Sequence, residues 1–189
     1  MIKKDGNTMI IDTFRDLKSS SAEFNKAKRK TVKLIVKSAE HDQKVIDIIN
    51  ALKEMRDLEW VEIQNPDAKL CSIDGMLYSR NGKDLYFCAR TGAVEIPDGT
   101  KTICEGAACN CMLSELVIPD SVKHIKNFAF FGSCILEEVK GGSGITDIED
   151  SVFLNCVRLK KFNIGKNMKH IGDRAFANTG LTEINLPDG

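Results

Sequence analysis

"LVIPDSVKHIKNFAF" at residues 116–130 returns forty-six residues later, in a related form, as "FNIGKNMKHIGDRAF" at residues 162–176. Both stretches contain a Lys-His-Ile triplet and, after it, an Ala-Phe pair. The triplet could be a catalytic element that is used twice, or a structural element that is used in every unit of a repeat. The spacing of apolar residues elsewhere in the chain decides between these two interpretations.

Apolar residues recur with one period in the second half of the chain. The isoleucines are spaced 22, 23 and 23 residues apart, and the phenylalanines 23 and 23. They are Ile103, Ile125, Ile148 and Ile171, and Phe130, Phe153 and Phe176. A fixed period of this length predicts a solenoid, in which each unit is too small to bury its own apolar face. The triplet is therefore interpreted as a structural element.

Each unit begins with a short strand such as "ELVIP". Alternation places Leu116 and Ile118 in the core and Glu115 and Val117 in solvent. Stacked units then form two rows of outward side chains, which we interpret as the binding surface. The first row is Ala93, Glu115, Glu138, Lys161 and Glu183, and the second is Glu95, Val117, Lys140, Asn163 and Asn185.

The phenylalanines are expected to stack as buried rings, one in each coil. The first unit has Ala108 where the ring should lie. We expect its core to be less well filled, or to be compensated by Met112 or by the preceding segment.

The stretches "IPDSVKHIKNFAFFGSCILEEV" and "IGDRAFANTGLTEINLPDG" resemble the BspA-like subclass of leucine-rich repeats, and the resemblance covers about residues 70–189. "CSIDGMLYSRNGKDLYF", residues 71–87, resembles the hairpin that often precedes such repeats, and Asn81–Gly82 is a good hairpin-turn signal within it. The resemblance implies a solenoid of short parallel strands. Because family members are often surface proteins implicated in adhesion and host contact, it also implies an adhesive role. Stacked strands place outward side chains on an extended rigid surface and not in a pocket, so the function that we favour is a non-catalytic binding module with a protein partner.

The N-terminal third does not match the repeat. Strands are predicted over residues 31–36 and 58–63, and an amphipathic helix over 40–55, whereas 19–30 is expected to be a loop. Leu34 and Val61 lie 27 residues apart, so this segment could be a helix-bearing coil of the same solenoid or a separate cap.

The predicted fold class is therefore α/β, a leucine-rich-repeat solenoid with an N-terminal α/β cap. The expected organisation is a cap over 1–69, a hairpin over 70–92, and four repeats with the start of a fifth over 93–189. Because the chain stops shortly after a unit opens at "EINLPDG", residues 183–189, we expect a longer array or a homodimer through the C-terminal edge.

Composition restricts the partners. Lys and Arg number 27 and Asp and Glu also number 27, which argues against broad attraction to nucleic acid or to anionic membranes. The longest apolar runs are about five residues, far below a membrane span, so no membrane insertion is expected. The N-terminal stretch lacks a signal-peptide core and the seven cysteines are an odd number, which favours the cytoplasm. The family resemblance favours the cell surface, so localisation stays open.

Three groups of residues could carry chemistry. His124 and His170 are expected about 9–10 Å apart on coils that flank Asp147, too far for two ligands of one ion, so an exposed repeat position is favoured. Cys104, Cys109 and Cys111 lack a C-x-x-C motif, and Cys111, Cys134 and Cys156 fall at or near a position where these repeats prefer cysteine. Structural thiols are favoured, and a cysteine-based redox or metal-responsive protein is the alternative function.

Two further stretches have less specific signals. "GGSG" at 141–144 lacks the lysine of a phosphate loop and is interpreted as a turn. "KAKRKTVK" at 26–33 carries five positive charges, and a solvated face is favoured over an anionic partner. Because the common catalytic fingerprints are missing from the sequence, we expect no enzyme, no cofactor and no metal site.

Overall fold

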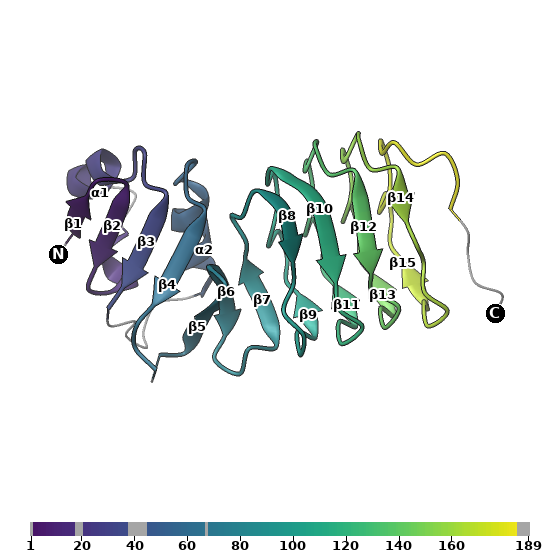
Figure 1. The fold of residues 1–189 in the computed structure, drawn as a ribbon, viewed down its shortest axis with the longest axis horizontal. Coiled ribbons are helices and arrows are strands. Elements are labelled where there is room, and N and C mark those ends of the chain that lie inside the picture. The colour runs from purple at the N-terminus through teal and green to yellow at the C-terminus, as the bar shows by residue number, and fades with distance from the viewer. Residues whose placement is uncertain (1, 18–20, 38–44, 67, 185–189) are drawn as a thin grey trace. The chain divides into compact units, whose positions relative to one another are not determined.

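The computed structural model describes the whole chain except residues 1, 18–20, 38–44, 67 and 185–189 (Figure 1). The chain divides into two compact units, residues 1–81 and residues 82–189. Each unit is built on parallel strands.

The N-terminal unit contains a four-stranded sheet in the order β1-β2-β3-β4. Its strands are β1 (Ile2–Asp5), β2 (Thr8–Ile11), β3 (Lys33–Val36) and β4 (Trp60–Ile63). The first two form an antiparallel hairpin, and β2, β3 and β4 run parallel. Met9, Leu34 and Val61 lie in register across the parallel strands and are fully buried. They form the core column of this unit.

Helices connect the parallel strands of this sheet. A short 3-10 helix, η1 (Phe14–Asp16), and the helix α1 (Ala22–Ala27) join β2 to β3, and α2 (Val45–Lys53) joins β3 to β4. Ile48, Ile49 and Leu52 of α2 are buried, so the predicted strand–helix–strand is confirmed in its described part. Leu34 and Val61 lie in register, and both the helix-bearing coil and the separate cap stay predictions.

The loop that we expected over residues 19–30 is wrong for its central part, which forms α1. The Phe24 N–H donates to Ser21 Oγ at 3.4 Å and caps the start of the helix. Phe24 is fully buried and Ala27 nearly so. One buried aromatic side chain therefore stabilises a six-residue helix in a mostly polar stretch.

Within the segment 71–87, where we predicted a hairpin with its turn at Asn81–Gly82, β5 (Leu70–Ile73) and β6 (Met76–Ser79) form an antiparallel hairpin. Its turn is Asp74–Gly75, where both residues have a positive φ, of 49° and 77°. A Cβ on Gly75 would lie 2.6 Å from the Trp60 ring, so glycine is required there. Asn81 and Gly82, which we predicted as a hairpin turn, lie where the two units divide.

The C-terminal unit has two columns of parallel strands, as Figure 1 shows. One sheet has the order β14-β12-β10-β8, and the other includes β15-β13-β11-β9-β7. The first is made of β8 (Gly92–Glu95), β10 (Leu113–Ile118), β12 (Glu138–Gly141) and β14 (Lys161–Phe162). The second is made of β7 (Asp84–Phe87), β9 (Thr102–Ile103), β11 (His124–Ile125), β13 (Asp147–Ile148) and β15 (His170–Ile171). Because β7 pairs in parallel with β9, the "DLYF" segment belongs to the array.

Stacked rings fill the core between these sheets. The centroids of Phe130 and Phe153 are 5.2 Å apart, and those of Phe153 and Phe176 are 5.4 Å apart, with interplanar angles of 5° and 11°. The predicted column of rings is therefore confirmed, with Phe130 and Phe153 buried and Phe176 half-buried. Ala108 is buried in the first coil, but Met112 is 51% exposed, so the expectation that Met112 compensates for the missing ring is wrong.

The C-terminal edge expected to pair in a homodimer includes residues 185–189, which lie outside the described residues. That expectation stays a prediction.

Candidate binding surface

The sheet of β8, β10, β12 and β14 places the two predicted rows side by side. Glu115 of β10 lies opposite Ala93 on one side and Glu138 on the other, and Glu138 lies opposite Lys161. In the second row, Val117 lies between Glu95 and Lys140. The predicted register is thus confirmed for these seven residues, which we call the ladder. Asn163 and Glu183 are exposed beyond the strands, and Asn185 lies outside the described residues.

The ladder stands on a buried layer that fixes its strands. Leu116 and Ile118 of β10 are each 1% exposed, and Val139 of β12 is 3% exposed. Their outward neighbours are exposed or half-buried. Because alternate side chains of a strand point to opposite faces, burial of one set holds the other set in solvent. The ladder is therefore a preformed surface of side chains on regular backbone.

Ion pairs connect the charged side chains of the ladder. Lys140 Nζ lies 3.0 Å from Glu115 Oε2 and 3.6 Å from Glu138 Oε2, and Lys161 Nζ lies 3.8 Å from Glu138 Oε1. The hydrogen bond to Glu115 and the charges of Glu115 and Glu138 raise the pKa of Lys140. Charges of both signs therefore lie side by side on the surface, which suits a partner with polar groups of both signs.

The histidine column lies on the other sheet. His124 and His170 lie opposite Asp147 on its two sides, and His124 Nδ1 is 3.1 Å from Asp147 Oδ2. A hydrogen bond from the Thr146 hydroxyl, aided by His124, lowers the pKa of Asp147. Both histidines are exposed, as predicted. Among the described residues, no group of three side chains is placed to hold a metal ion.

A column of small hydroxyl and thiol side chains links successive coils. Ser133 Oγ donates to Ala108 O at 3.0 Å, and Cys156 Sγ donates to Phe130 O at 3.2 Å. Ser133 thus takes the place that cysteine has in the next coil, and Cys134 is displaced to an exposed position. The structural interpretation of Cys156 is therefore supported by its hydrogen bond.

Burial weakens the acidity of several thiols. It raises the pKa of Cys88 to about 11, and the pKa values of Cys104 and Cys156 to about 12. The thiolate is the nucleophile and the metal ligand, so thiols with raised pKa values are poorly suited to either role at neutral pH. Cys88, Cys104 and Cys156 are therefore poor candidates for the redox or metal-responsive alternative.

In the Gly-rich segment at 141–144, Gly141 ends β12, and Ser143 and Gly144 lie in the turn that we predicted. Gly142 N–H donates to Ile118 O at 2.7 Å, and Ser143 N–H donates to Asp120 Oδ1 at 3.0 Å. A Cβ on Gly144 would lie 1.8 Å from the backbone oxygen of Asp120, which explains glycine there. Because these N–H groups are already bonded within the protein, the turn is not arranged to hold a phosphate.

Comparisons with known proteins agree with this architecture. The family model described as "BspA type Leucine rich repeat region" matches residues 82–189 in six copies, beginning before the first unit that we recognised at residue 93. A search of curated protein sequences finds no match. Neither described helix is long and apolar enough to cross a membrane.

Solved structures share the fold at low sequence identity. The pneumococcal vaccine antigen PcpA is 22% identical with a TM-score of 0.61, over 67% of this chain and 33% of that one. A leucine-rich cell surface protein from Faecalibacterium prausnitzii is 24% identical with a TM-score of 0.60, over 78% of this chain and 43% of that one. A leucine-rich repeat protein from Bacteroides capillosus is 21% identical with a TM-score of 0.54, over 61% of this chain and 96% of that one.

The chain thus spans about a third of the length of PcpA, and at these identities the likeness concerns the fold alone. The family model, by contrast, covers more than half of the chain. The periodic isoleucines, the stacked rings and the paired parallel strands all lie within the matched residues. The chain therefore belongs to the BspA-type leucine-rich repeat family.

Proposed function

We propose that this chain is a non-catalytic binding module that presents the ladder to a protein partner. The observation that carries the proposal is the in-register arrangement of outward side chains on β8, β10, β12 and β14 over a buried layer. A surface of this kind loses little backbone freedom when a partner binds. Its charges of both signs favour selection of a partner with complementary charge.

Adhesion is the form of binding that we favour. The Faecalibacterium prausnitzii structure is described as a cell surface protein, and PcpA as a vaccine antigen. Those descriptions belong to those proteins, and they support an adhesive role for this chain only as part of the proposal.

Site-specific cross-linking tests the location of the binding surface. A photo-reactive residue replaces Glu95 in the ladder or, as a control, Glu105 beyond β9, and both positions are exposed. Each protein is exposed to the surface of intact cells and to extracts. We expect one saturable cross-linked partner from position 95, competed by unlabelled protein, and little from position 105. Equal cross-linking from both positions would contradict the proposal.

A further inference from the structure

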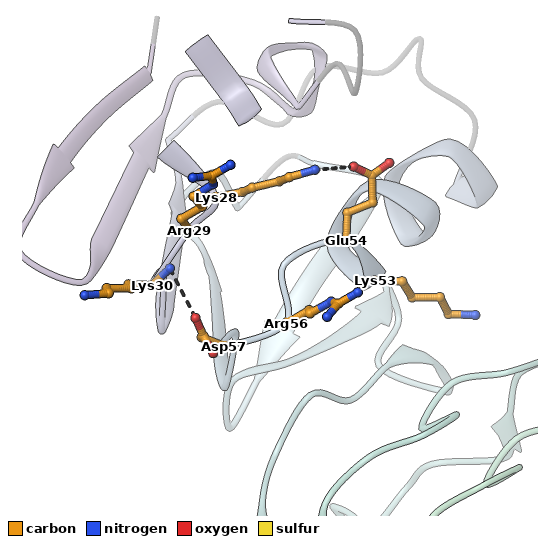
Figure 2. Close-up of a pocket in the computed structure, with 7 residues that line it drawn as sticks. All are labelled: Lys28, Arg29, Lys30, Lys53, Glu54, Arg56 and Asp57. Atoms are coloured by element: carbon orange, nitrogen blue, oxygen red, sulfur yellow. Dashed lines mark hydrogen bonds and ion pairs between the residues drawn. The ribbon is translucent and has the colours of Figure 1, made fainter. Parts of the chain in front are cut away.

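A second candidate site lies in the N-terminal unit. Seven side chains line a hollow of about 590 Å³ (Figure 2). We call it the basic hollow, and its residues are Lys28, Arg29, Lys30, Lys53, Glu54, Arg56 and Asp57. Ligand pockets generally measure about 300–1,000 Å³, so the basic hollow has the size of a small-molecule site.

Two successive coils bring these residues together. Lys28 to Lys30 directly follow α1, and Lys53 to Asp57 end α2 and lead into β4. Lys28 Nζ lies 2.7 Å from Glu54 Oε2, and Lys30 N–H donates to Asp57 Oδ2 at 3.1 Å. These two contacts connect one rim of the hollow to the other, as the dashed lines in Figure 2 show.

Buried neighbours hold both rims in place. Thr31 is fully buried, and its hydroxyl donates to Ala27 O at 2.7 Å. On the other rim, Met55 and Leu58 are each 3% exposed, and Leu58 N–H donates to Met55 O at 3.0 Å. The charged side chains between these anchors are therefore carried on a defined backbone, which lowers the entropic cost of binding a ligand.

Positive charge exceeds negative charge in the hollow. Five of the lining side chains are cationic and two are carboxylates, an excess of three. Within the described part of the chain, no carboxylate lies within ion-pair distance of Arg29, Lys30, Lys53 or Arg56. The carboxyl ends of α1 and α2 add roughly half a negative charge each, which leaves an excess of about two. Because the whole chain is neutral, this is a local concentration of charge and not a general property.

The kinds of cation indicate the ligand. Arginine presents a planar fork of donors that matches the oxygens of phosphate or sulfate groups, and lysine adds a point charge. In Figure 2, Arg56 is drawn between Lys30 and Lys53, whose side chains extend toward opposite sides of the view. This spread of cations suits a ligand with more than one anionic group. We propose that the basic hollow binds a small polyanion bearing phosphate or sulfate groups.

Isothermal titration calorimetry on the full chain tests this proposal with three probes. Inorganic tripolyphosphate represents phosphate, a multiply sulfated disaccharide represents sulfate, and an oligoglutamate peptide represents a carboxylate ligand. The test variant is Arg29→Gln/Arg56→Gln. The control is Lys166→Gln/Lys169→Gln in the repeat unit, which removes the same charge from two exposed positions outside both proposed sites.

We expect saturable one-to-one binding of tripolyphosphate or of the sulfated disaccharide. The test variant should weaken that binding by about tenfold or more, because the charge-assisted hydrogen bonds of two guanidinium groups are lost. The control variant should leave the affinity unchanged. The tighter of the two probes identifies the anion. A second variant, Arg29→Lys/Arg56→Lys, keeps the charge and should also weaken binding, since lysine has no fork.

Three results would overturn the proposal. They are no saturable binding of either probe, equal weakening in the test and control variants, and oligoglutamate binding that matches the better probe and depends on the same arginines. Circular dichroism and urea midpoints establish that each variant is folded before titration. All four substituted side chains are exposed, so we expect these midpoints to be unchanged.

Discussion

Phe153 lies against Phe130 with ring centroids 5.2 Å apart and an interplanar angle of 5°. On its other side, the centroid of Phe176 is 5.4 Å away. Phe153 is fully buried, whereas Phe162, which touches both Phe153 and Phe176, is half-buried. The middle ring of the column therefore has packing neighbours on both faces, and its removal would leave a cavity between coils.

Phe153→Ala should destabilise the protein by about 3–5 kcal/mol, because it removes a buried ring and leaves a cavity. Phe162→Leu should cost less than about 1.5 kcal/mol, because it keeps most of the volume at a half-buried position. Urea midpoints and m-values of the two variants provide the measurement. Equal and small losses would mean that Phe153 contributes little to the core.

Lys161→Glu should alter partner binding far more than stability. The Lys161 side chain is 73% exposed and lies 3.8 Å from Glu138. An exposed pair of this kind contributes only about 0.2–1 kcal/mol, so the urea midpoint should move little. In the cross-linking experiment with the photo-reactive residue at position 95, the charge reversal should strongly reduce the yield of cross-linked partner. The reason is that it places a second acid beside Glu138. Lys166→Glu, an exposed substitution outside the ladder, is the control. Global unfolding of the Lys161 variant would mean that the row of Glu115, Glu138 and Lys161 has a structural role and is not a binding surface.

The repeat unit could be predicted from the sequence because one coil has a nearly constant length. Equal spacing places Phe130, Phe153 and Phe176 on one line, and it places Glu115 opposite Glu138. The period of the apolar residues alone is enough to predict this alignment, and no knowledge of side-chain packing is needed. The ligand of the ladder could not be predicted in the same way, since exposed positions of a repeat are free to vary without loss of the fold.

The N-terminal unit was harder to predict because its coils are few and unequal. Met9 pairs with Leu34, and Leu34 with Val61, at separations of 25 and 27 residues, so no single period stands out. Helix α1 has only two buried residues, which is too few for a helical pattern. Lys28 and Glu54 line the basic hollow together because they occupy corresponding places on adjacent coils of this unit. Comparison of charged residues 25–27 apart would have found it.

Asp147 should make stability dependent on acid pH. Its pKa lies below the ordinary value of 3.8, chiefly because the Thr146 hydroxyl donates to the carboxylate, with a further contribution from His124. A lowered folded pKa stabilises the protein above the ordinary value, and that stabilisation is lost as pH falls through the folded value. Asp147→Asn should therefore reduce the loss of stability from about pH 5 to about pH 3. The effect should be below about 1 kcal/mol, because the site is partly exposed.

Urea midpoints across this pH range provide the measurement for Asp147. Asp98→Asn is the matched control, because Asp98 is exposed and no hydrogen bond or ion pair to its side chain is seen in the described part of the chain. If both variants follow the wild-type pH profile, the contact with Thr146 and His124 does not contribute to stability.

The thiols should react in an order set by exposure and acidity. Cys134 is exposed, whereas Cys88 and Cys156 are buried and have pKa values raised to about 11 and about 12. Because the thiolate is the reactive form, a maleimide at neutral pH should label Cys134 first in the native protein. Cys88 and Cys156 should react only after denaturation. Peptide mapping by mass spectrometry follows each site, and Cys134→Ser should remove the fastest phase.

Cys104 is the decisive position for the alternative function. Burial, with the nearby charge of Asp84, raises its pKa to about 12, so its labelling at neutral pH should be slow. Labelling at pH 10 should stay slower for Cys104 than for Cys134, since a thiol of this pKa remains mostly protonated there. If Cys104 instead reacts as fast as Cys134 at neutral pH, its thiol is activated. That result would favour a redox function over the binding module proposed for this chain.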